Sequence, residues 1–204
     1  MTRIKICGLS REEDIAAVNR WLPDYVGFVF AASKRKVTPE QAARLKRKLD
    51  ARIKAVGVFT NESPDVIADL CTEGIIDFVQ LHGDENEEYI RMLRNRTSCP
   101  IIKAVRVQST AQILKNQELP CDMLLLDTFN PAEYGGSGRT FDLSLIPTLS
   151  KPYFLAGGLH QGNIADAIAQ HHPFAVDISS GVETAGSKDE AKIREIVELV
   201  RRMN

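Results

Sequence analysis

A cysteine and an aspartate each close a short apolar segment, where a reactive side chain could meet a ligand. Cys7 ends RIKIC (3–7) and Asp127 ends MLLLD (123–127). Reference pKa values of about 8.5 for cysteine and about 3.9 for aspartate must both move toward neutrality before such a pair works as base and acid. Packing is the alternative role for Cys7, because free cysteine is often buried. A carboxylate after MLLL must be paired, solvated or functional.

The alternation around Cys7 places a cation on the same face of its segment. In a β-strand, side chains at i and i+2 share a face, so Lys5 accompanies Cys7, opposite the two isoleucines. The same alternation orients Asp177 within FAVDIS (174–179). If this last segment closes against the first, we expect Lys5 and Asp177 to point inward as close neighbours. A nearby ammonium group would favour the thiolate form of Cys7.

Glycine-containing turns follow the last two apolar segments. AGGL supplies Gly157 and Gly158, and DISSGVE supplies Ser179 and Ser180. Glycine allows backbone N–H groups to approach an anion, and the serine hydroxyls add donors. Gly-Gly after a strand is more often a plain tight turn, but the two turns together favour a phosphate site.

Two further polar side chains follow apolar segments. Arg35 lies in SKRK, which by itself is typical of a solvated basic loop, and His82 lies in QLHG, where a polar residue at the rim of a sheet is the simple interpretation. Both positions are nevertheless compatible with a ligand site.

Eight short apolar segments could form strands that carry these side chains: 3–7, 25–30, 53–59, 77–82, 101–107, 123–127, 153–158 and 174–179. Helix-compatible stretches between them include 38–49, 63–74, 85–96, 163–172 and 189–203. Thr38 and Ser63 can cap free N–H groups, and a proline follows each at the first helical position.

Regular alternation of strand and helix implies parallel strands with right-handed crossovers. We therefore predict one (βα)8 TIM barrel over residues 1–204, with its site at the C-terminal ends of the strands. A phosphate after strands seven and eight would hold a ligand between Asp127 and Cys7. The alternative, an open doubly wound sheet, would be expected to show GxGxxG after the first strand, and ICGLSREED lacks it. The long segment 130–142 is a candidate functional loop.

Composition limits the partners. The chain has 26 Lys and Arg residues against 27 Asp and Glu residues, which argues against nucleic acid or an anionic membrane and favours a small molecule. No apolar run approaches the roughly 18 residues of a membrane span, so we expect a cytoplasmic protein. The four cysteines show no metal-ligand spacing and resemble reduced thiols. Monomer and homodimer both stay open.

The ordered motifs KICGL, GFVF, SKR, VGVF, VQLHG, LLLD, YGGSG, AGGL and FAVDISSGVE resemble the phosphoribosylanthranilate isomerase family of tryptophan biosynthesis. The resemblance covers the whole chain. It implies a (βα)8 barrel that needs no metal or organic cofactor. It also implies an Amadori rearrangement that turns N-(5-phosphoribosyl)anthranilate into 1-(2-carboxyphenylamino)-1-deoxyribulose 5-phosphate.

The resemblance assigns roles to the candidate residues. Asp127 would be the general acid and Cys7 the general base, and Arg35 would hold the anthranilate carboxylate as a planar bidentate donor. The remaining substrate-binding positions would be the rim residue His82 and the phosphate-side residues Gly157, Gly158, Asp177, Ser179, Ser180 and Gly181. We expect Asp177 to orient the backbone or Lys5, without direct contact to phosphate.

Other functions fit parts of the same pattern. Indoleglycerol phosphate synthase would be expected to use lysine and glutamate at strand ends. Ribulose phosphate epimerase would use a metal held by histidines and aspartates, but His160, His171 and His172 are not placed for that role. A noncatalytic phosphate-ligand protein is a third possibility, and the presence of Cys7 together with Asp127 argues against it.

Overall fold

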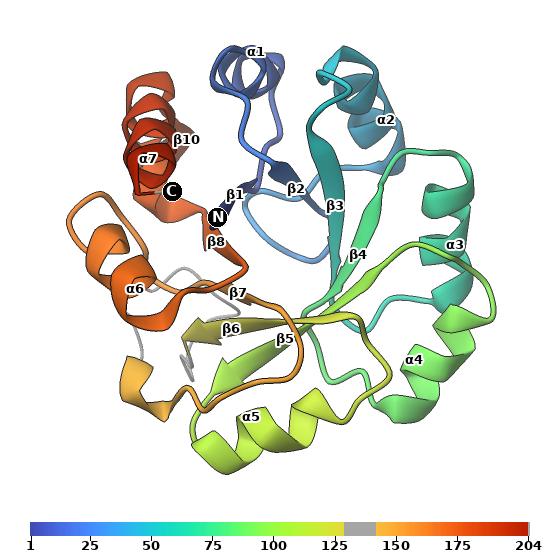
Figure 1. Cartoon of the computed structure of the whole chain (residues 1–204). Helices are drawn as coiled ribbons and strands as arrows, with labels where there is room; N and C mark the ends of the chain where they lie inside the picture. Colours follow the sequence, from blue (N-terminus) through green and yellow to red (C-terminus); the bar gives the residue numbers. More distant parts are fainter. Residues whose placement is uncertain (129–141, 204) are drawn as a thin grey trace.

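Eight parallel strands form a closed barrel in the computed structural model, which describes residues 1–128 and 142–203 (Figure 1). The strands are β1 (Arg3–Cys7), β2 (Tyr25–Val29), β3 (Lys54–Phe59), β4 (Phe78–Leu81), β5 (Ile101–Val107), β6 (Met123–Thr128), β7 (Tyr153–Leu155) and β8 (Ala175–Ile178). All eight predicted segments are therefore strands, with ends that shift by up to three residues. The predicted barrel is confirmed, and the open-sheet alternative is wrong.

The barrel closes through β1 and β8, which pair in parallel and place Lys5 opposite Asp177. This register is the reason that the inward faces of the first and last strands meet. The predicted neighbourhood of Lys5 and Asp177 is thus a direct consequence of closure.

Helices surround the barrel: α1 (Glu12–Trp21), α2 (Pro39–Lys48), α3 (Pro64–Thr72), α4 (Glu87–Arg94), α5 (Thr110–Gln117), α6 (Ile164–His171) and α7 (Glu190–Arg202). The predicted caps are present, because Thr38 accepts a hydrogen bond from the Gln41 N–H and Ser63 accepts one from the Asp65 N–H. The predicted helical stretches are confirmed, each slightly shorter than expected.

The connection from β6 to β7 differs from the regular alternation. Within its described part, residues 142–152, only a 3₁₀ turn η1 (Leu143–Leu145) forms, followed by Pro147 and Pro152. Proline lacks the N–H that a continuing helix would need. The long loop predicted for 130–142 lies outside the described residues except for Asp142.

Apolar side chains fill the barrel interior at the N-terminal ends of the strands. The inner cluster contains Tyr25, Val56 and Phe154, and the Tyr25 and Phe154 rings meet edge to face with centroids 5.4 Å apart. A larger apolar layer lies between strands and helices and includes Ile4 and Ile6. Because this packing closes the end of the barrel at which the strands begin, a ligand can enter only from the end at which the strands terminate.

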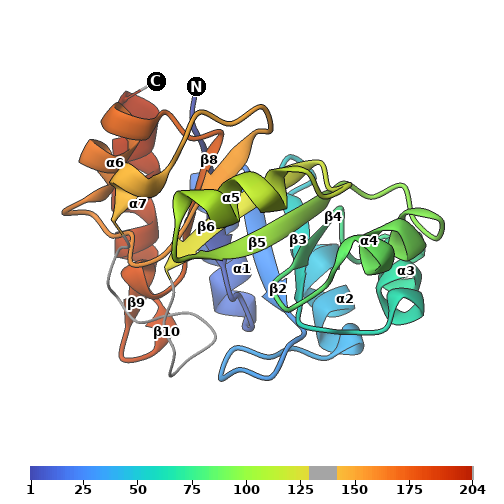
Figure 2. The same ribbon diagram turned by 90° about the horizontal axis from the view of Figure 1, so that it is seen from below.

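The connection after β8 adds structure at that open end. A 3₁₀ turn η2 (Ser180–Val182) leads into a small hairpin of β9 (Glu183–Thr184) and β10 (Ser187–Lys188). Figure 2 shows this hairpin at the end of the molecule opposite both chain termini. Of the helices in the described ranges, none has both the length and the apolar character to cross a membrane.

Candidate active site

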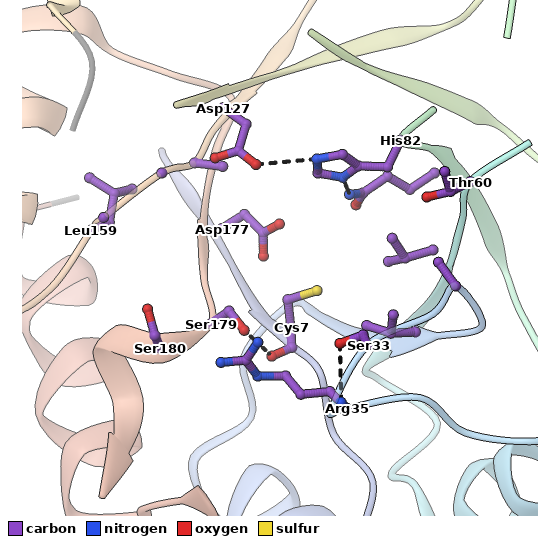
Figure 3. Close-up of a pocket in the computed structure, with 17 residues that line it drawn as sticks. Cys7, Ser33, Arg35, Thr60, His82, Asp127, Leu159, Asp177, Ser179 and Ser180 are labelled. Atoms are coloured by element: carbon purple, nitrogen blue, oxygen red, sulfur yellow. Dashed lines mark hydrogen bonds and ion pairs between the residues drawn. The ribbon is translucent and has the colours of Figure 1, made fainter. Parts of the chain in front are cut away.

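A pocket opens at the C-terminal ends of the strands, and it brings together residues from across the chain (Figure 3). Nine of the ten predicted site residues line it: Cys7, Arg35, His82, Asp127, Gly157, Gly158, Asp177, Ser179 and Ser180. The proposed base and the proposed acid thus face one cavity. Gly181, the tenth, does not line it.

Cys7 lies beside a buried ion pair. Lys5 is completely buried, and its Nζ donates a hydrogen bond to Asp177 Oδ2 at 2.7 Å. Asp177 Oδ1 is also buried and has no hydrogen-bond partner within the described part of the chain. The expectation that Lys5 and Asp177 point inward and touch is confirmed.

Opposing effects act on the pKa of the Cys7 thiol. Burial raises the pKa of Cys7, while the Lys5 and Lys188 ammonium groups oppose that rise and the Asp177 carboxylate adds to it. Burial would lower the pKa of Lys5, but Asp177 and Cys7 together raise it, so Lys5 stays charged. In the free protein at neutral pH, Cys7 is therefore mainly a thiol, held where any thiolate that forms meets an ammonium group.

Asp127 lies on the other side of the pocket, close to a histidine. Its Oδ1 accepts a hydrogen bond from the Thr128 N–H at 2.8 Å, and its Oδ2 is 3.2 Å from His82 Nε2. The histidine ring is not aligned for a hydrogen bond across that gap. His82 is therefore a direct neighbour of the proposed acid, which the sequence did not reveal.

Gln80 also belongs to this side, and the sequence analysis missed it. Its side-chain nitrogen lies 2.9 Å from His82 Nδ1, and it is 1% exposed. The alternation of a strand could have identified this contact, because Gln80 and His82 are two residues apart on one face.

The two glycine turns approach each other closely. Gly157 and Gly158 have φ values of 84° and 65°, which L side chains rarely adopt. A Cβ on Gly157 would lie 2.2 Å from Thr128 Oγ1, and one on Gly181 would lie 2.1 Å from the Leu159 carbonyl oxygen. Gly181 thus serves the packing of one turn against the other. Together the turns form the pocket wall between β6 and β1.

Arg35 reaches across the pocket toward Ser179 and is held by a carboxylate that sequence reasoning did not single out (Figure 3). Its Nε and Nη2 donate to Glu183 Oε1 and Oε2 at 2.7 and 2.8 Å. A Cβ on Gly8 would lie 2.4 Å from Arg35 Cδ, so the arginine side chain crosses directly over the turn after β1. The side chain of Arg35 is only 15% exposed and lines the pocket, as expected for a ligand-site residue, although SKRK by itself is typical of a solvated loop.

The four cysteines are all free, as expected, and Cys71 and Cys99 pack at the edge of the core. Within residues 1–128 and 142–203, no group of three or more His, Cys, Asp or Glu side chains is arranged to hold a metal ion.

Known proteins share both the sequence and the architecture. The family model for N-(5'-phosphoribosyl)anthranilate isomerase matches residues 4–199. The N-(5'-phosphoribosyl)anthranilate isomerase of Endomicrobium trichonymphae is 49% identical over 201 residues, which span 98% of this chain and 99% of that protein. The crystal structure of the isomerase from Thermus thermophilus superposes with a TM-score of 0.87 at 30% identity, covering 100% of both chains.

Two further solved structures extend the comparison. One isomerase structure, in complex with reduced 1-(o-carboxyphenylamino)-1-deoxyribulose 5-phosphate, has a TM-score of 0.82 at 34% identity and covers 99% of this chain and 100% of that one. Another describes monomers generated from the dimeric isomerase of Thermotoga maritima, with a TM-score of 0.82 at 36% identity and the same coverage. The chain belongs to the N-(5'-phosphoribosyl)anthranilate isomerase family.

Proposed function

We propose that Cys7 and Asp127 perform the reaction of this chain, the isomerisation of N-(5'-phosphoribosyl)anthranilate in tryptophan biosynthesis. The observation that carries the proposal is that one pocket contains a thiol, a carboxyl group and two glycine turns. In the rearrangement, sugar carbon C1 is reduced while C2 is oxidised, so the electrons balance within one molecule. One proton is added to the ring oxygen and one is removed from C2, which gives an enolamine, and its tautomerisation to the ketone then moves a proton from the C2 hydroxyl group to C1.

In the first step, Asp127 donates a proton to the furanose oxygen as the C1–O bond breaks. The nitrogen lone pair forms the C1=N bond, which gives a Schiff base. Asp127 is 7% exposed, so its proton is shielded from water.

In the second step, Cys7 removes the proton from C2, and the electrons of that C–H bond move toward the iminium nitrogen. An enolamine results, and its tautomerisation gives the ketone. The burial that raises the pKa of Cys7 makes its thiolate a stronger base, and Lys5 stabilises the thiolate once it forms. Cys7 and Asp127 come from β1 and β6, which the two strands of the phosphate side separate.

The substrate has an anion at each end, and the pocket offers a donor for each. The turns with Gly157, Gly158, Ser179 and Ser180 would bind the phosphate, and the Arg35 guanidinium would bind the anthranilate carboxylate. Asp177 carries the wrong charge for phosphate. Its Oδ1 has no hydrogen-bond partner among the described residues, and at the pocket wall it is suited to accept a hydrogen bond from a sugar hydroxyl group.

We further propose that residues 1–204 act as one catalytic barrel in the cytoplasm, without nucleic acid, membrane, metal or organic cofactor as a partner. Near-neutral charge and four free cysteines support this setting. Both monomer and homodimer are compatible with the site, since all of its proposed residues come from one chain. The dimeric relative from Thermotoga maritima favours testing for a homodimer first.

The test follows the fluorescence of freshly generated N-(5-phosphoribosyl)anthranilate with wild type, Cys7→Ala and Asp127→Asn, in the presence of a chelator. We expect rapid loss of signal with wild type and a decrease of about 10²- to 10⁴-fold in each variant, the usual effect of removing an acid or base.

Binding of the reduced product analogue serves as the control, because both variants should retain it. Wild type that binds this analogue but shows no turnover above the spontaneous background would indicate a noncatalytic phosphate-ligand protein. Activity that disappears with the chelator would instead favour a metal-dependent phosphosugar reaction.

A further inference from the structure

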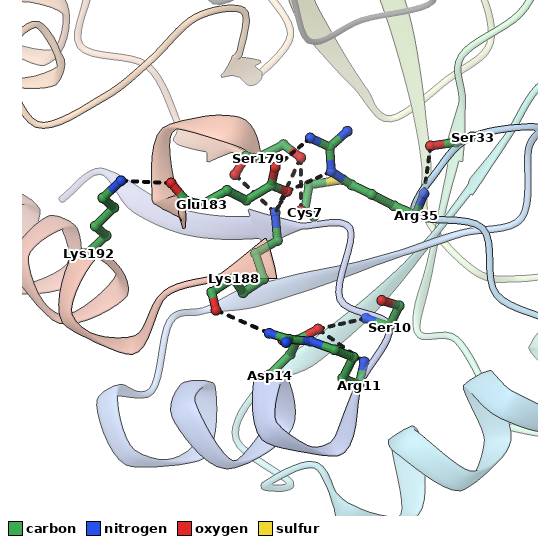
Figure 4. Close-up of polar contacts among 10 residues, drawn as sticks. All are labelled: Cys7, Ser10, Arg11, Asp14, Ser33, Arg35, Ser179, Glu183, Lys188 and Lys192. Carbon is green, nitrogen blue, oxygen red and sulfur yellow. Dashed lines mark hydrogen bonds and ion pairs between the residues drawn. The ribbon is translucent and has the colours of Figure 1, made fainter. Parts of the chain in front are cut away.

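The carboxylate of Glu183, at the start of β9, contacts two cations on the side of the pocket where Arg35 lies. Glu183 accepts two hydrogen bonds from Arg35 and a third, at 2.7 Å, from Lys188 Nζ (Figure 4). The Glu183 and Lys188 side chains are only 6% and 2% exposed. Burial would raise the pKa of Glu183, but its two partners lower it to about 2, so the carboxylate is ionised at neutral pH.

The contact with Glu183 leaves a defined part of Arg35 available. A guanidinium group has five N–H donors in a rigid plane, and Glu183 occupies the edge formed by Nε and Nη2. The edge formed by Nη1 and the second hydrogen of Nη2 can still bind another carboxylate in bidentate fashion. Glu183 therefore determines the direction in which Arg35 presents its free edge.

The same network continues to the phosphate side. Lys188 Nζ donates to the Ser179 carbonyl oxygen at 2.9 Å, and Ser179 Oγ donates to the Cys7 carbonyl oxygen at 3.0 Å. One set of partly buried contacts thus links Arg35, the turn after β8 and the strand end that bears Cys7. A shift at one of these points would move the others.

The hairpin that carries Glu183 and Lys188 is itself fixed from two sides. Lys192 Nζ donates to the Glu183 carbonyl oxygen at 2.7 Å, and Arg11 Nη2 donates to the Lys188 carbonyl oxygen at 3.1 Å. Arg11 is in turn held by Asp14, which is 3% exposed (Figure 4). The backbone positions of Glu183 and Lys188 are therefore set by the first and last helices.

We propose that Glu183 and Lys188 are positioning residues that fix the distance and direction between Arg35 and the phosphate-binding turn, and so select ligands with a carboxylate at one end and a phosphate at the other. The proposal rests on the function proposed above. A purely structural ion cluster would stabilise the fold without affecting which ligand binds, and this difference can be measured.

The experiment compares two probes by calorimetry. The first is reduced 1-(o-carboxyphenylamino)-1-deoxyribulose 5-phosphate, and the second is its phenylamino counterpart without the ring carboxylate. We expect Glu183→Gln to weaken the first probe about tenfold, as the loss of one charge-assisted contact implies, and to change the second by less than about twofold. Lys188→Met should weaken both probes, because Lys188 contacts the phosphate turn as well.

Glu87→Gln is the matched control, because Glu87 forms an exposed ion pair with Arg91 on α4, and it should change neither probe. Thermal unfolding verifies that each variant folds, and the neutral variant Glu183→Gln/Lys188→Gln replaces any single variant that does not. An equal change of both probes in Glu183→Gln, or no change at all, would overturn the proposal.

Turnover of wild type is measured in parallel. If wild type binds the carboxylated probe more tightly than its counterpart without the carboxylate but does not isomerise the substrate, the acid–base assignment is contradicted. The result on the positioning role of Glu183 and Lys188 can then still be interpreted. The two proposals can therefore fail separately.

Discussion

The two sides of the barrel mouth are built differently. On the side of β1 and β8, the charged groups form short contacts, with 2.7 Å between Lys5 and Asp177 and 2.7 Å between Lys188 and Glu183. On the side of β4 and β6, His82 approaches Asp127 only to 3.2 Å. Gln80 Oε1 there is buried without a hydrogen-bond partner among the described residues.

This difference matches the tasks proposed for the two sides. Groups that bind anions or stabilise a thiolate must keep a constant charge, and a tightly paired network holds that charge. An acid must lose and regain its proton, and close pairing with a cation would keep it ionised. The loosely contacted Asp127 is therefore better suited to transfer a proton than a carboxylate such as Glu183.

The largest effect is expected when the paired side loses its central cation. Lys5→Met leaves Asp177 buried without its partner, which should lower the free energy of unfolding by about 3–5 kcal/mol. It also removes the ammonium group that lowers the pKa of Cys7. The limb of the kcat/KM profile that reports the titration of Cys7, on the alkaline side, should therefore move to higher pH. Urea unfolding and a pH profile measure both effects.

The variant Lys5→Met/Asp177→Asn is the control for that measurement. It should recover much of the stability, because no uncompensated charge stays buried, but it should not restore a cation beside Cys7. An alkaline limb that stays in place in Lys5→Met would show that Lys5 does not assist the thiolate.

A smaller effect is expected from Arg35→Lys, which keeps the charge but loses the planar pair of donors. KM should rise about tenfold while kcat changes much less, because binding of the carboxylate is weakened uniformly. Steady-state kinetics test this split. A decrease confined to kcat would place Arg35 in the chemical step instead.

On the loosely contacted side, His82→Asn should reduce kcat by only about two- to tenfold. The asparagine cannot reproduce the ring next to Asp127, yet Asp127 keeps its own contact with the Thr128 N–H. Steady-state kinetics of His82→Asn, measured together with those of Gln80→Leu, test this expectation. A loss as large as that of Asp127→Asn would mean that His82 itself transfers a proton.

The smallest effect concerns stability in acid. The pKa of Glu183 is lowered from 4.5 to about 2 in the folded protein, so the unfolded chain binds more protons between these values. The contribution of this carboxylate is complete above about pH 4.5 and is lost as the pH falls toward 2. In Glu183→Gln, chemical unfolding should therefore depend less on pH in this window. An unchanged slope would contradict the pairing of Glu183.

The fold was accessible from local patterns, because strand alternation and helix caps act over a few residues. The glycine-containing turns after β7 and β8 were predicted to meet for the same reason, since the barrel places the ends of these strands at one rim. The exception is the stretch after β6, where residues 142–152 form only a 3₁₀ turn despite the regular alternation elsewhere. Pro147 and Pro152 in this stretch lack the N–H group that a longer helix would need.

The sequence by itself determined the strands, their inward faces and the meeting of Lys5 with Asp177, because a period of two and the closure of a barrel leave only one arrangement. Only the tertiary structure decided that Arg35 pairs with Glu183, 148 residues away, and that the His82 side chain lies next to the Asp127 carboxyl group. Long side chains in loops have many possible partners of suitable charge. Which one they meet depends on the paths of distant turns, which no local pattern specifies.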